Sequence, residues 1–218
     1  MLKVGVFGTG AVGNAIGTKL AELGHPVMMG SRTANNPKAL AFVAKNHQKA
    51  LAGTFADAAE YGELIFNCTA GMGSIDALKM AGENRLNGKI IVDIANPLDF
   101  SKGMPPTLSI SNTSSLGEEI QQTFPKTMVV KTLNTMWCAI MVNPAMVGGG
   151  DHHVFMSGND SSSKALVKEI LKSFGWNENN IVDLGGITTA RGTEMYLPLW
   201  LSIFGSEKNG AFNIKIVR

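Results

Sequence analysis

The amino-terminal residues alternate between short apolar runs and turns bounded by glycine. Residues 2–7 form a β-rich run that ends at Gly8, and residues 11–23 follow with good helix formers. Residues 26–29 form a second short apolar run that ends at Gly30. This pattern predicts a strand, a helix and a second strand, with a tight glycine turn before the helix.

Similar runs recur along the chain. Apolar stretches that predict further buried strands lie at 64–68, 89–93, 128–131 and 153–156. Helical patterns between them lie around 37–46, 74–81 and 116–123. Near-continuous apolar strands separated by helices are typical of a parallel sheet that is covered on both faces. We therefore expect an α/β fold with a doubly wound, mainly parallel sheet.

The last third of the chain predicts a smaller set of elements after a triple glycine. These are a strand near 153, a helix over 162–173, a short strand near 181, a helical stretch over 188–203 and a final strand over 211–217. About 65 residues are too few for an independent catalytic domain. We therefore expect a single domain over 1–218, with a core over about 1–147 and a C-terminal extension over about 151–218.

Composition narrows the class of protein. Of 218 residues, 44% are hydrophobic and 17% are charged, which excludes intrinsic disorder. Lys plus Arg (19) and Asp plus Glu (17) give a net charge of +2, too balanced for attraction to nucleic acid through the overall field. Two distant cysteines, the lack of a signal peptide's apolar stretch and the lack of a long apolar window favour a reduced, cytoplasmic protein without a membrane partner.

A glycine-rich string follows the first predicted strand: Gly8-Thr9-Gly10-Ala11-Val12-Gly13. Its position between a strand and a helix is the arrangement that binds a dinucleotide. There Gly8 makes the turn, Gly10 lets the backbone approach a pyrophosphate and Gly13 lets the helix meet the strand. The helix N-terminus then offers free N–H groups to the anion. The string therefore predicts a dinucleotide site.

The end of the second predicted strand indicates which dinucleotide binds. It consists of Gly30-Ser31-Arg32-Thr33. A site that prefers NAD places Asp or Glu there, about 20 residues after the glycines, to accept from the ribose 2′-hydroxyl. This chain offers hydroxyl and guanidinium donors instead, and these suit a 2′-phosphate, with Lys38 as a further positive charge. We expect NADP(H).

The loops after the later strands form the candidate active site, because the nicotinamide lies beyond the carboxyl ends of the strands. These loops span 68–72, 94–98 and 132–136 and are small, polar and uncharged. They contain no Lys and no His, so the sequence identifies no catalytic residue. Hydride exchange between two redox cofactors needs aligned rings more than acid–base groups.

Three residues near the loops invite other interpretations. His152 and His153 are adjacent on a predicted strand and point to opposite faces, so we expect no metal site. Cys68 stands beside the nicotinamide loop without a partner base, which favours a packed thiol.

Several segments together resemble the coenzyme F420-dependent NADP oxidoreductases. They are the glycine string, Leu23-Gly24-His25, Gly30-Ser31-Arg32, Val130-Lys131-Thr132-Leu133-Asn134-Thr135, Met156-Ser157-Gly158-Asn159-Asp160, Val182-Asp183-Leu184-Gly185 and Ala190-Arg191. The resemblance implies a Rossmann domain with a small C-terminal extension, commonly dimeric, that moves hydride between NADP(H) and a deazaflavin. The reductase domain of the STEAP metalloreductases, which uses a flavin, is a more distant relative.

Carried over by position, the resemblance also implies a set of cofactor contacts. The pyrophosphate would lie against Thr9 to Val12, and the 2′-phosphate against Ser31, Arg32 and Thr33. The ribose and nicotinamide would be flanked by Thr69, Ala70, Ala95, Asn96 and Asn134. The chain differs from the archaeal members over 69–71 and 134–137, where the second ring would stack, so the acceptor stays open between coenzyme F420 and a flavin.

Two further functions stay open. One is direct reduction of a small imine or carbonyl compound, which is disfavoured because the enzymes of that kind carry a long helical second domain and an active-site Lys. The other is a module that binds NADP as a sensor, without turnover. A nicotinamide face closed by Met136 or Trp137 would favour the sensor.

Overall fold

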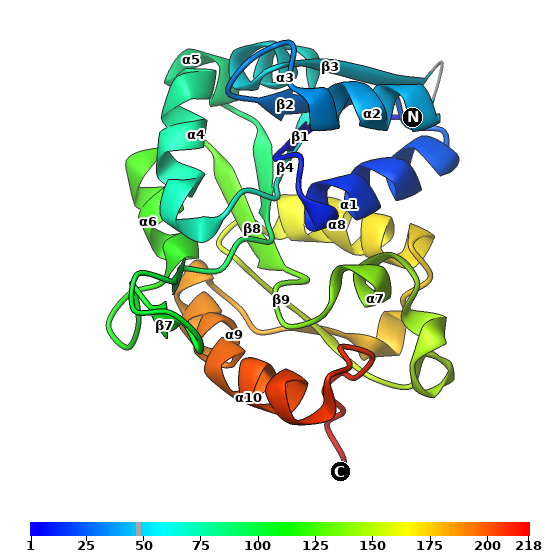
Figure 1. The fold of residues 1–218 in the computed structure, drawn as a ribbon, viewed down its shortest axis with the longest axis vertical. Coiled ribbons are helices and arrows are strands. Elements are labelled where there is room, and N and C mark those ends of the chain that lie inside the picture. The colour runs from blue at the N-terminus through cyan, green and yellow to red at the C-terminus, as the bar shows by residue number, and fades with distance from the viewer. Residues whose placement is uncertain (47–48) are drawn as a thin grey trace.

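The computed structural model describes residues 1–46 and 49–218, and its central feature is an eight-stranded sheet (Figure 1). The strand order is β10-β9-β8-β5-β4-β1-β2-β3. The strands are β1 (Val4–Phe7), β2 (Val27–Ser31), β3 (Ala50–Thr54), β4 (Leu64–Asn67), β5 (Ile90–Asp93), β8 (Met128–Thr132), β9 (Val154–Gly158) and β10 (Ile181–Asp183). Within this sheet, β8 and β9 pair antiparallel and the other neighbouring strands pair parallel. A small hairpin, β6 (Leu98–Asp99) and β7 (Thr107–Leu108), lies outside this sheet.

Helices join most of the strands. They are α1 (Ala11–Glu22), α2 (Pro37–Asn46), α3 (Phe55–Tyr61), α4 (Ser74–Ala81), α5 (Glu83–Leu86), α6 (Leu116–Thr123), α7 (Cys138–Val142), α8 (Ser161–Ser173), α9 (Ala190–Met195) and α10 (Leu197–Glu207). Short 3-10 turns are η2 (Gly71–Gly73), η3 (Pro144–Met146), η4 (Gly148–Gly150), η5 (Glu178–Asn180) and η6 (Ile187–Thr189).

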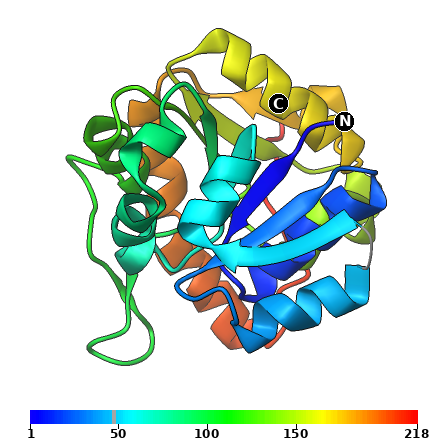
Figure 2. The ribbon, with the colours of Figure 1, turned by 90° about the horizontal axis from the view of Figure 1, so that it is seen from above.

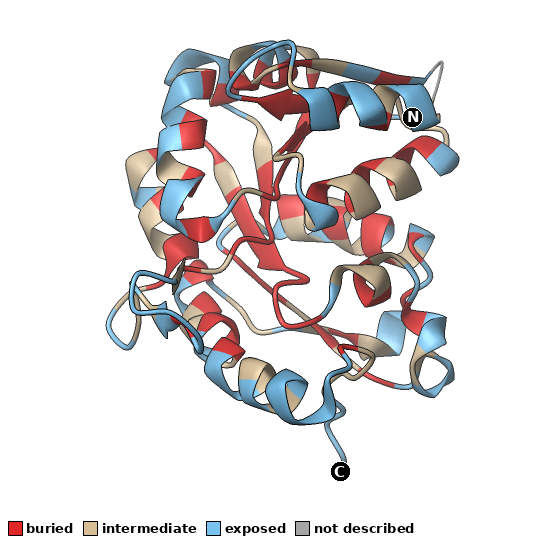
Figure 3. Ribbon diagram, in the orientation of Figure 1, coloured by how far each residue is buried: buried red, intermediate tan, exposed pale blue. Residues whose placement is uncertain are grey.

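Helices cover both faces of the sheet (Figure 2), and a hydrophobic core lies on each face. Side chains alternate along each strand, so Val6 belongs to the core that includes residues of α1, α2, α7 and α8, and Phe7 to the core that includes residues of α3 to α6. The central strands β1 and β4 are buried on both faces, whereas the edge strand β3 carries the exposed Leu51 (Figure 3). The prediction of a doubly wound, mainly parallel α/β fold is therefore confirmed, and β9 and β10 extend the same sheet.

Local sequence explains where several helices begin. At α3, Thr54 Oγ1 accepts from the Asp57 backbone N–H (3.1 Å), and the Asp57 carboxylate accepts from the Thr54 N–H (2.8 Å). At α6, Ser115 accepts from the Glu118 N–H (3.1 Å). Each such cap satisfies backbone donors that the first helical turn cannot satisfy itself.

The C-terminal residues differ from the expectation. The predicted final strand over 211–217 is wrong, because this segment forms no strand. The His153 N–H donates to the Ile214 carbonyl (2.9 Å), but the Ile216 N–H donates to the His153 ring (3.1 Å). Because a side chain takes the second bond, no regular backbone ladder develops.

Helix α10 stands apart from both cores. Most of the helix is coloured as exposed or intermediate (Figure 3). The apolar side chains Leu199 and Phe204 are exposed, and Leu197 is the buried residue of the helix. Among the helices of the described ranges 1–46 and 49–218, none has the length and apolarity that a membrane crossing requires.

Candidate functional site

The turn between β1 and α1 is built on close backbone approach. Gly8 has a φ of +109°, and a Cβ there would lie 2.6 Å from the Cys68 carbonyl oxygen. A Cβ on Gly13 would lie 2.0 Å from the Gly8 carbonyl oxygen. A Cβ on Gly10 would meet no atom within 4 Å. The fold therefore requires glycine at 8 and 13, whereas the glycine at 10 leaves open space above the turn.

The N-terminus of α1 faces that open space without a side-chain cap. Gly10 is the N-cap residue, and the first turn carries no acidic side chain. Asn14 Nδ2 instead donates to the Thr9 and Gly10 carbonyls (3.1 and 3.2 Å) and holds the turn rigid. Free backbone N–H groups and the positive end of the helix dipole are the features that bind phosphate. The geometry fits a pyrophosphate.

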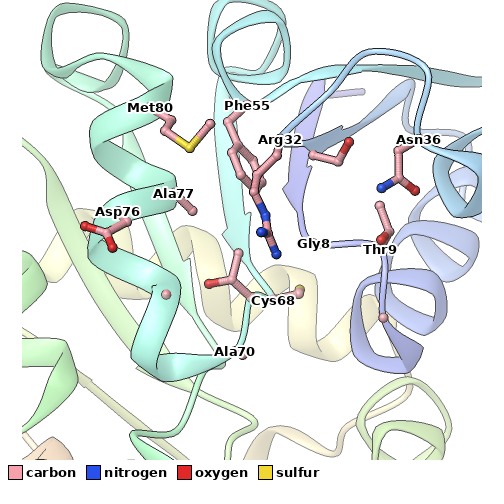
Figure 4. Close-up of a pocket in the computed structure, with 14 residues that line it drawn as sticks. Gly8, Thr9, Arg32, Asn36, Phe55, Cys68, Ala70, Asp76, Ala77 and Met80 are labelled. Carbon is pink, nitrogen blue, oxygen red and sulfur yellow. The ribbon is translucent and has the colours of Figure 1, made fainter.

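A cavity of about 610 Å³ opens at the carboxyl ends of β1, β2 and β4 (Figure 4). The strand order reverses here, because β1 lies between β4 and β2, and such a switch point is where open α/β sheets bind ligands. The lining residues are Gly8, Thr9, Gly10, Ser31, Arg32, Asn36, Phe55, Cys68, Thr69, Ala70, Gly73, Asp76, Ala77 and Met80.

Arg32 is the positively charged side chain in the lining of this cavity. Its side chain points from the end of β2 into the cavity (Figure 4), and within the described ranges it forms no ion pair. The buried Ser31 hydroxyl donates to the Thr33 carbonyl (2.6 Å), so its proton is used inside the turn. Thr33 and Lys38 are exposed and do not line the cavity, whereas Asn36 does.

A second, smaller cavity of about 190 Å³ adjoins the first and shares Cys68, Thr69 and Ala70 with it. It is lined by Val12, Cys68, Thr69, Ala70, Gly71, Ile94, Ala95, Asn96, Leu98 and Phe100. No charged side chain is among these lining residues. We call it the small compartment.

The remaining predicted residues lie beside these cavities. Asn134 is buried, and its side-chain amide donates to Asn96 Oδ1 (2.9 Å). Its backbone carbonyl accepts from Asn96 Nδ2 (2.9 Å). It therefore orients Asn96 rather than lining either cavity. Ala11, in the first turn of α1, is exposed and also lies outside both lining sets. The structure thus gathers most of the predicted residues around two joined cavities and leaves Ala11, Thr33, Lys38 and Asn134 outside the lining.

A buried ion cluster, which the sequence interpretation missed, lies directly behind the loops of the small compartment. Lys131 Nζ lies 2.8 Å from an oxygen of Asp93 and 2.8 Å from an oxygen of Glu194. All three side chains are at most 1% exposed. Burial alone would lower the pKa of Lys131, but attraction to Asp93 and Glu194 outweighs it and raises that pKa above its usual value.

Cys68, Trp137 and His152 are residues for which the sequence allows other interpretations. Burial, with a contribution from Asp93, raises the pKa of the Cys68 thiol, which therefore stays protonated. Trp137 is exposed, and its ring packs on Gly210. His152 is buried, with Nε2 2.9 Å from the Pro144 carbonyl. Among the residues that the structure describes, no three His, Cys, Asp or Glu side chains gather as metal ligands do.

Fold and cavities together define a dinucleotide-binding protein of the doubly wound class. The profile of the family described as NADP oxidoreductase, coenzyme F420-dependent, matches residues 3–97. A solved structure of a proposed F420-dependent NADP reductase from Arthrobacter sp. FB24 is 50% identical, with a TM-score of 0.94 over 100% of both chains. The chain belongs to the F420-dependent NADP oxidoreductase family, and the prediction of an NADP-dependent oxidoreductase is confirmed.

More distant proteins share the fold. Metalloreductase STEAP3 from Rattus norvegicus is 28% identical over 205 residues, which are 91% of this chain and 38% of that protein. The chain thus spans well under half the length of this relative. An imine reductase from Myxococcus stipitatus is 16% identical with a TM-score of 0.63, over 95% of this chain and 63% of that one. At that identity the likeness shows the fold alone.

Proposed function

We propose that this protein transfers hydride between NADP(H) and a deazaflavin or flavin acceptor. The observation that carries the proposal is the pairing of the two cavities. One offers an open helix N-terminus and Arg32, which forms no ion pair with any residue that the structure describes, and the other is small, uncharged and adjacent. The first suits the phosphates of NADP(H), and the second suits a flat, neutral ring.

Different residues of the two adjoining cavities would contact different parts of NADP(H). The backbone of Thr9, Gly10 and Val12 would hold the pyrophosphate, and Arg32 would pair with the 2′-phosphate. Thr69 and Ala70, which line both cavities, would lie along the ribose. Ala95 and Asn96 would position the nicotinamide in the small compartment. When bound, NADPH supplies the hydride, so the protein's task is to align two rings and exclude water.

The edge of the small compartment supports a planar acceptor. Phe100 lines it and is 56% exposed, and Met72, one residue beyond the lining residue Gly71, is 60% exposed. Exposed apolar side chains at the mouth of an uncharged, mostly apolar cavity mark a place where a ring system can pack. The family name and the Arthrobacter relative favour coenzyme F420. A flavin stays a candidate because the sequence resembles the STEAP metalloreductases.

The buried Lys131 argues against direct reduction of an imine or carbonyl compound. An acid for such a reaction must reach the substrate and release its proton near neutral pH. Lys131 is 1% exposed, donates to two carboxylates and has a raised pKa. It therefore does not supply the proton donor that the loops lack.

An acceptor panel tests the proposal. Purified protein is mixed anaerobically with NADPH and either F420, FMN, FAD or a small imine, and loss of reduced nicotinamide absorbance is followed, with NADH as the control donor. Rapid loss with a deazaflavin or flavin and with NADPH only is expected. Tight NADPH binding without turnover on any acceptor would overturn the proposal and favour the sensor module. The homodimer stays a prediction, and light scattering tests it.

A further inference from the structure

We propose that Lys131, Asp93 and Asn67 form a positioning network that locks together the two loops of the small compartment. The inference rests on the proposed function, because it assigns the nicotinamide to that compartment. The loops contain residues 69–71 and 94–96, and they follow β4 and β5. The ammonium lies behind them and touches neither cavity.

Strand register brings the polar groups into one row. Asn67 on β4 pairs with Asp93 on β5, and Asp93 pairs with Lys131 on β8. Partners in register on parallel strands point to the same face, here the face that α4 and α6 cover. Each of the three residues ends its strand or stands one residue before the end. The row therefore lies immediately behind the loops that leave the sheet.

One loop is held directly by the ion pair. The Lys131 ammonium donates to Asp93, to Glu194 and to the Ala95 carbonyl, so all three of its N–H groups are used. The Ala95 N–H donates to the other Asp93 oxygen (3.2 Å). Both backbone polar groups of Ala95, a lining residue of the small compartment, are thus bound to the cluster.

The second loop is held through an amide. Asn67 Nδ2 donates to Asp93 Oδ1 (2.8 Å), and Asn67 Oδ1 accepts from the Thr69 hydroxyl (2.7 Å). The Thr69 hydroxyl also lies 2.8 Å from Ser74 Oγ, at the start of α4. Asp93 is therefore the common partner of both loops, and Lys131 neutralises and orients it. A network in which every member is satisfied is rigid.

Glu194 anchors the cluster on its far side. Its carboxylate accepts from the Leu116 and Gly117 N–H groups (2.8 and 3.1 Å) at the N-terminus of α6. The two carboxylates carry one more charge than the single ammonium, and the positive end of the α6 dipole compensates for it. The cluster is thereby fixed to the C-terminal part of the chain.

The residues proposed to bind the phosphates lie outside this network, and Thr69 is the network member that also lines the larger cavity. Gly10 and Arg32 lie on other segments, and neither hydrogen bonds to Asp93, Lys131 or Asn67. Loosening the network should therefore disturb the nicotinamide half of the ligand and leave the phosphate half bound. This selectivity distinguishes positioning from a general loss of stability.

The test compares NADPH with adenosine 2′,5′-bisphosphate, which lacks the nicotinamide. In Asp93→Asn, the Kd of NADPH should rise about tenfold and that of the bisphosphate less than about twofold, with loss of nicotinamide fluorescence enhancement. Asn67→Ala, which keeps the ion pairs and cuts the link to Thr69, should shift the same ratio in the same direction. Leu171→Ala, at a buried position of α8, is the stability control and should not change the ratio.

The positioning role would be overturned if Asp93→Asn raised the Kd of both ligands equally or changed neither Kd. If Asp93→Asn does not fold, the result for Asn67→Ala decides by the same ratio. Failure of the proposed function shows differently, because wild-type protein would then not bind NADPH better than the bisphosphate or would not turn over any acceptor. The two failures are therefore separable.

Discussion

Lys131 on β8 and Asp93 on β5 are register partners, and their charged atoms lie 2.8 Å apart with both side chains at most 1% exposed. A buried ion pair is costly to form, so its placement in the centre of a sheet needs a reason. The reason is the position of the pair at the ends of β5 and β8, beside the candidate nicotinamide loops. The pair holds the ends of the strands together at the point where they become the site.

Removal of the ammonium should destabilise the protein strongly. Lys131→Met keeps the length of the side chain but leaves Asp93 and Glu194 buried without a counter-charge, and we expect a loss of about 3–5 kcal/mol of unfolding free energy. Urea unfolding followed by circular dichroism measures it. A loss below about 1 kcal/mol would show that the carboxylates do not depend on Lys131.

The cluster of Lys131, Asp93 and Glu194 left a signal in the sequence that our interpretation did not use. A search for catalytic groups in the loops excludes residues that belong to strands, and Lys131 and Asp93 lie within β8 and β5. The available indication was a charged residue at the same end of two otherwise apolar strands. Charged side chains in central strands are rare unless they are paired.

The main sheet was predictable because its strands are short apolar runs. By contrast, β3 and α3 were not predicted: β3 has the sequence ALAGT, without the β-branched and aromatic residues that mark strands. Thr54 and Asp57, the residues of the α3 capping box, were an available signal for the start of this helix that the sequence interpretation did not use. The wrong strand over 211–217 shows the opposite error, since alternating apolar residues do not form a strand without a free edge partner.

The 2′-phosphate role of Arg32 predicts a selective effect. Arg32→Ala should raise the Kd of NADPH by about tenfold to a hundredfold and leave that of NADH nearly unchanged, because a charge-assisted pair is lost only with the phosphorylated ligand. Calorimetric titration measures both constants. Lys38→Ala is the matched control, because Lys38 is exposed outside the cavity lining, and its effect should be small. Equal weakening of NADPH and NADH would contradict the role of Arg32.

The glycines of the first turn predict two different defects. Gly10→Ala should fold within about 1 kcal/mol of wild type, since the new methyl group meets no protein atom, yet it should weaken NADPH because it occupies the open space above the turn. Gly13→Ala should instead lose ~3 kcal/mol of stability, because its methyl group would lie 2.0 Å from the Gly8 carbonyl oxygen. Thermal unfolding and NADPH titration separate the two, and normal NADPH binding by Gly10→Ala would refute the pyrophosphate assignment.

The partly buried ion pair between α6 and α9 predicts a pH dependence. Arg191 donates to both oxygens of Glu118 (2.8 and 2.5 Å), and these bonds, against the opposing effect of partial burial, hold the pKa of Glu118 below its ordinary value of 4.5. Because the folded-state pKa is lowered, this stabilisation is present above that value and is lost as the pH falls through the lowered one.

Glu118→Gln, which retains a capping-compatible side chain, checks this dependence. Its deficit in unfolding free energy relative to wild type should be largest near neutral pH and should shrink toward about pH 3. Urea unfolding at several pH values gives the comparison. A deficit that stays constant across the range would show that the Glu118 charge contributes nothing.

Direct transfer of hydride from the nicotinamide to a ring acceptor is the central claim, and isotopic labelling tests it most directly. NADPH deuterated on either face of the nicotinamide C4 is mixed anaerobically with the protein and F420 in a single turnover, and the reduced deazaflavin is analysed by mass spectrometry, with FMN tested in parallel for rate. The account predicts that deuterium from one face only appears in the deazaflavin and that transfer of deuterium is slower than transfer of hydrogen. Reduction of neither acceptor, while NADPH stays bound and intact, would contradict it.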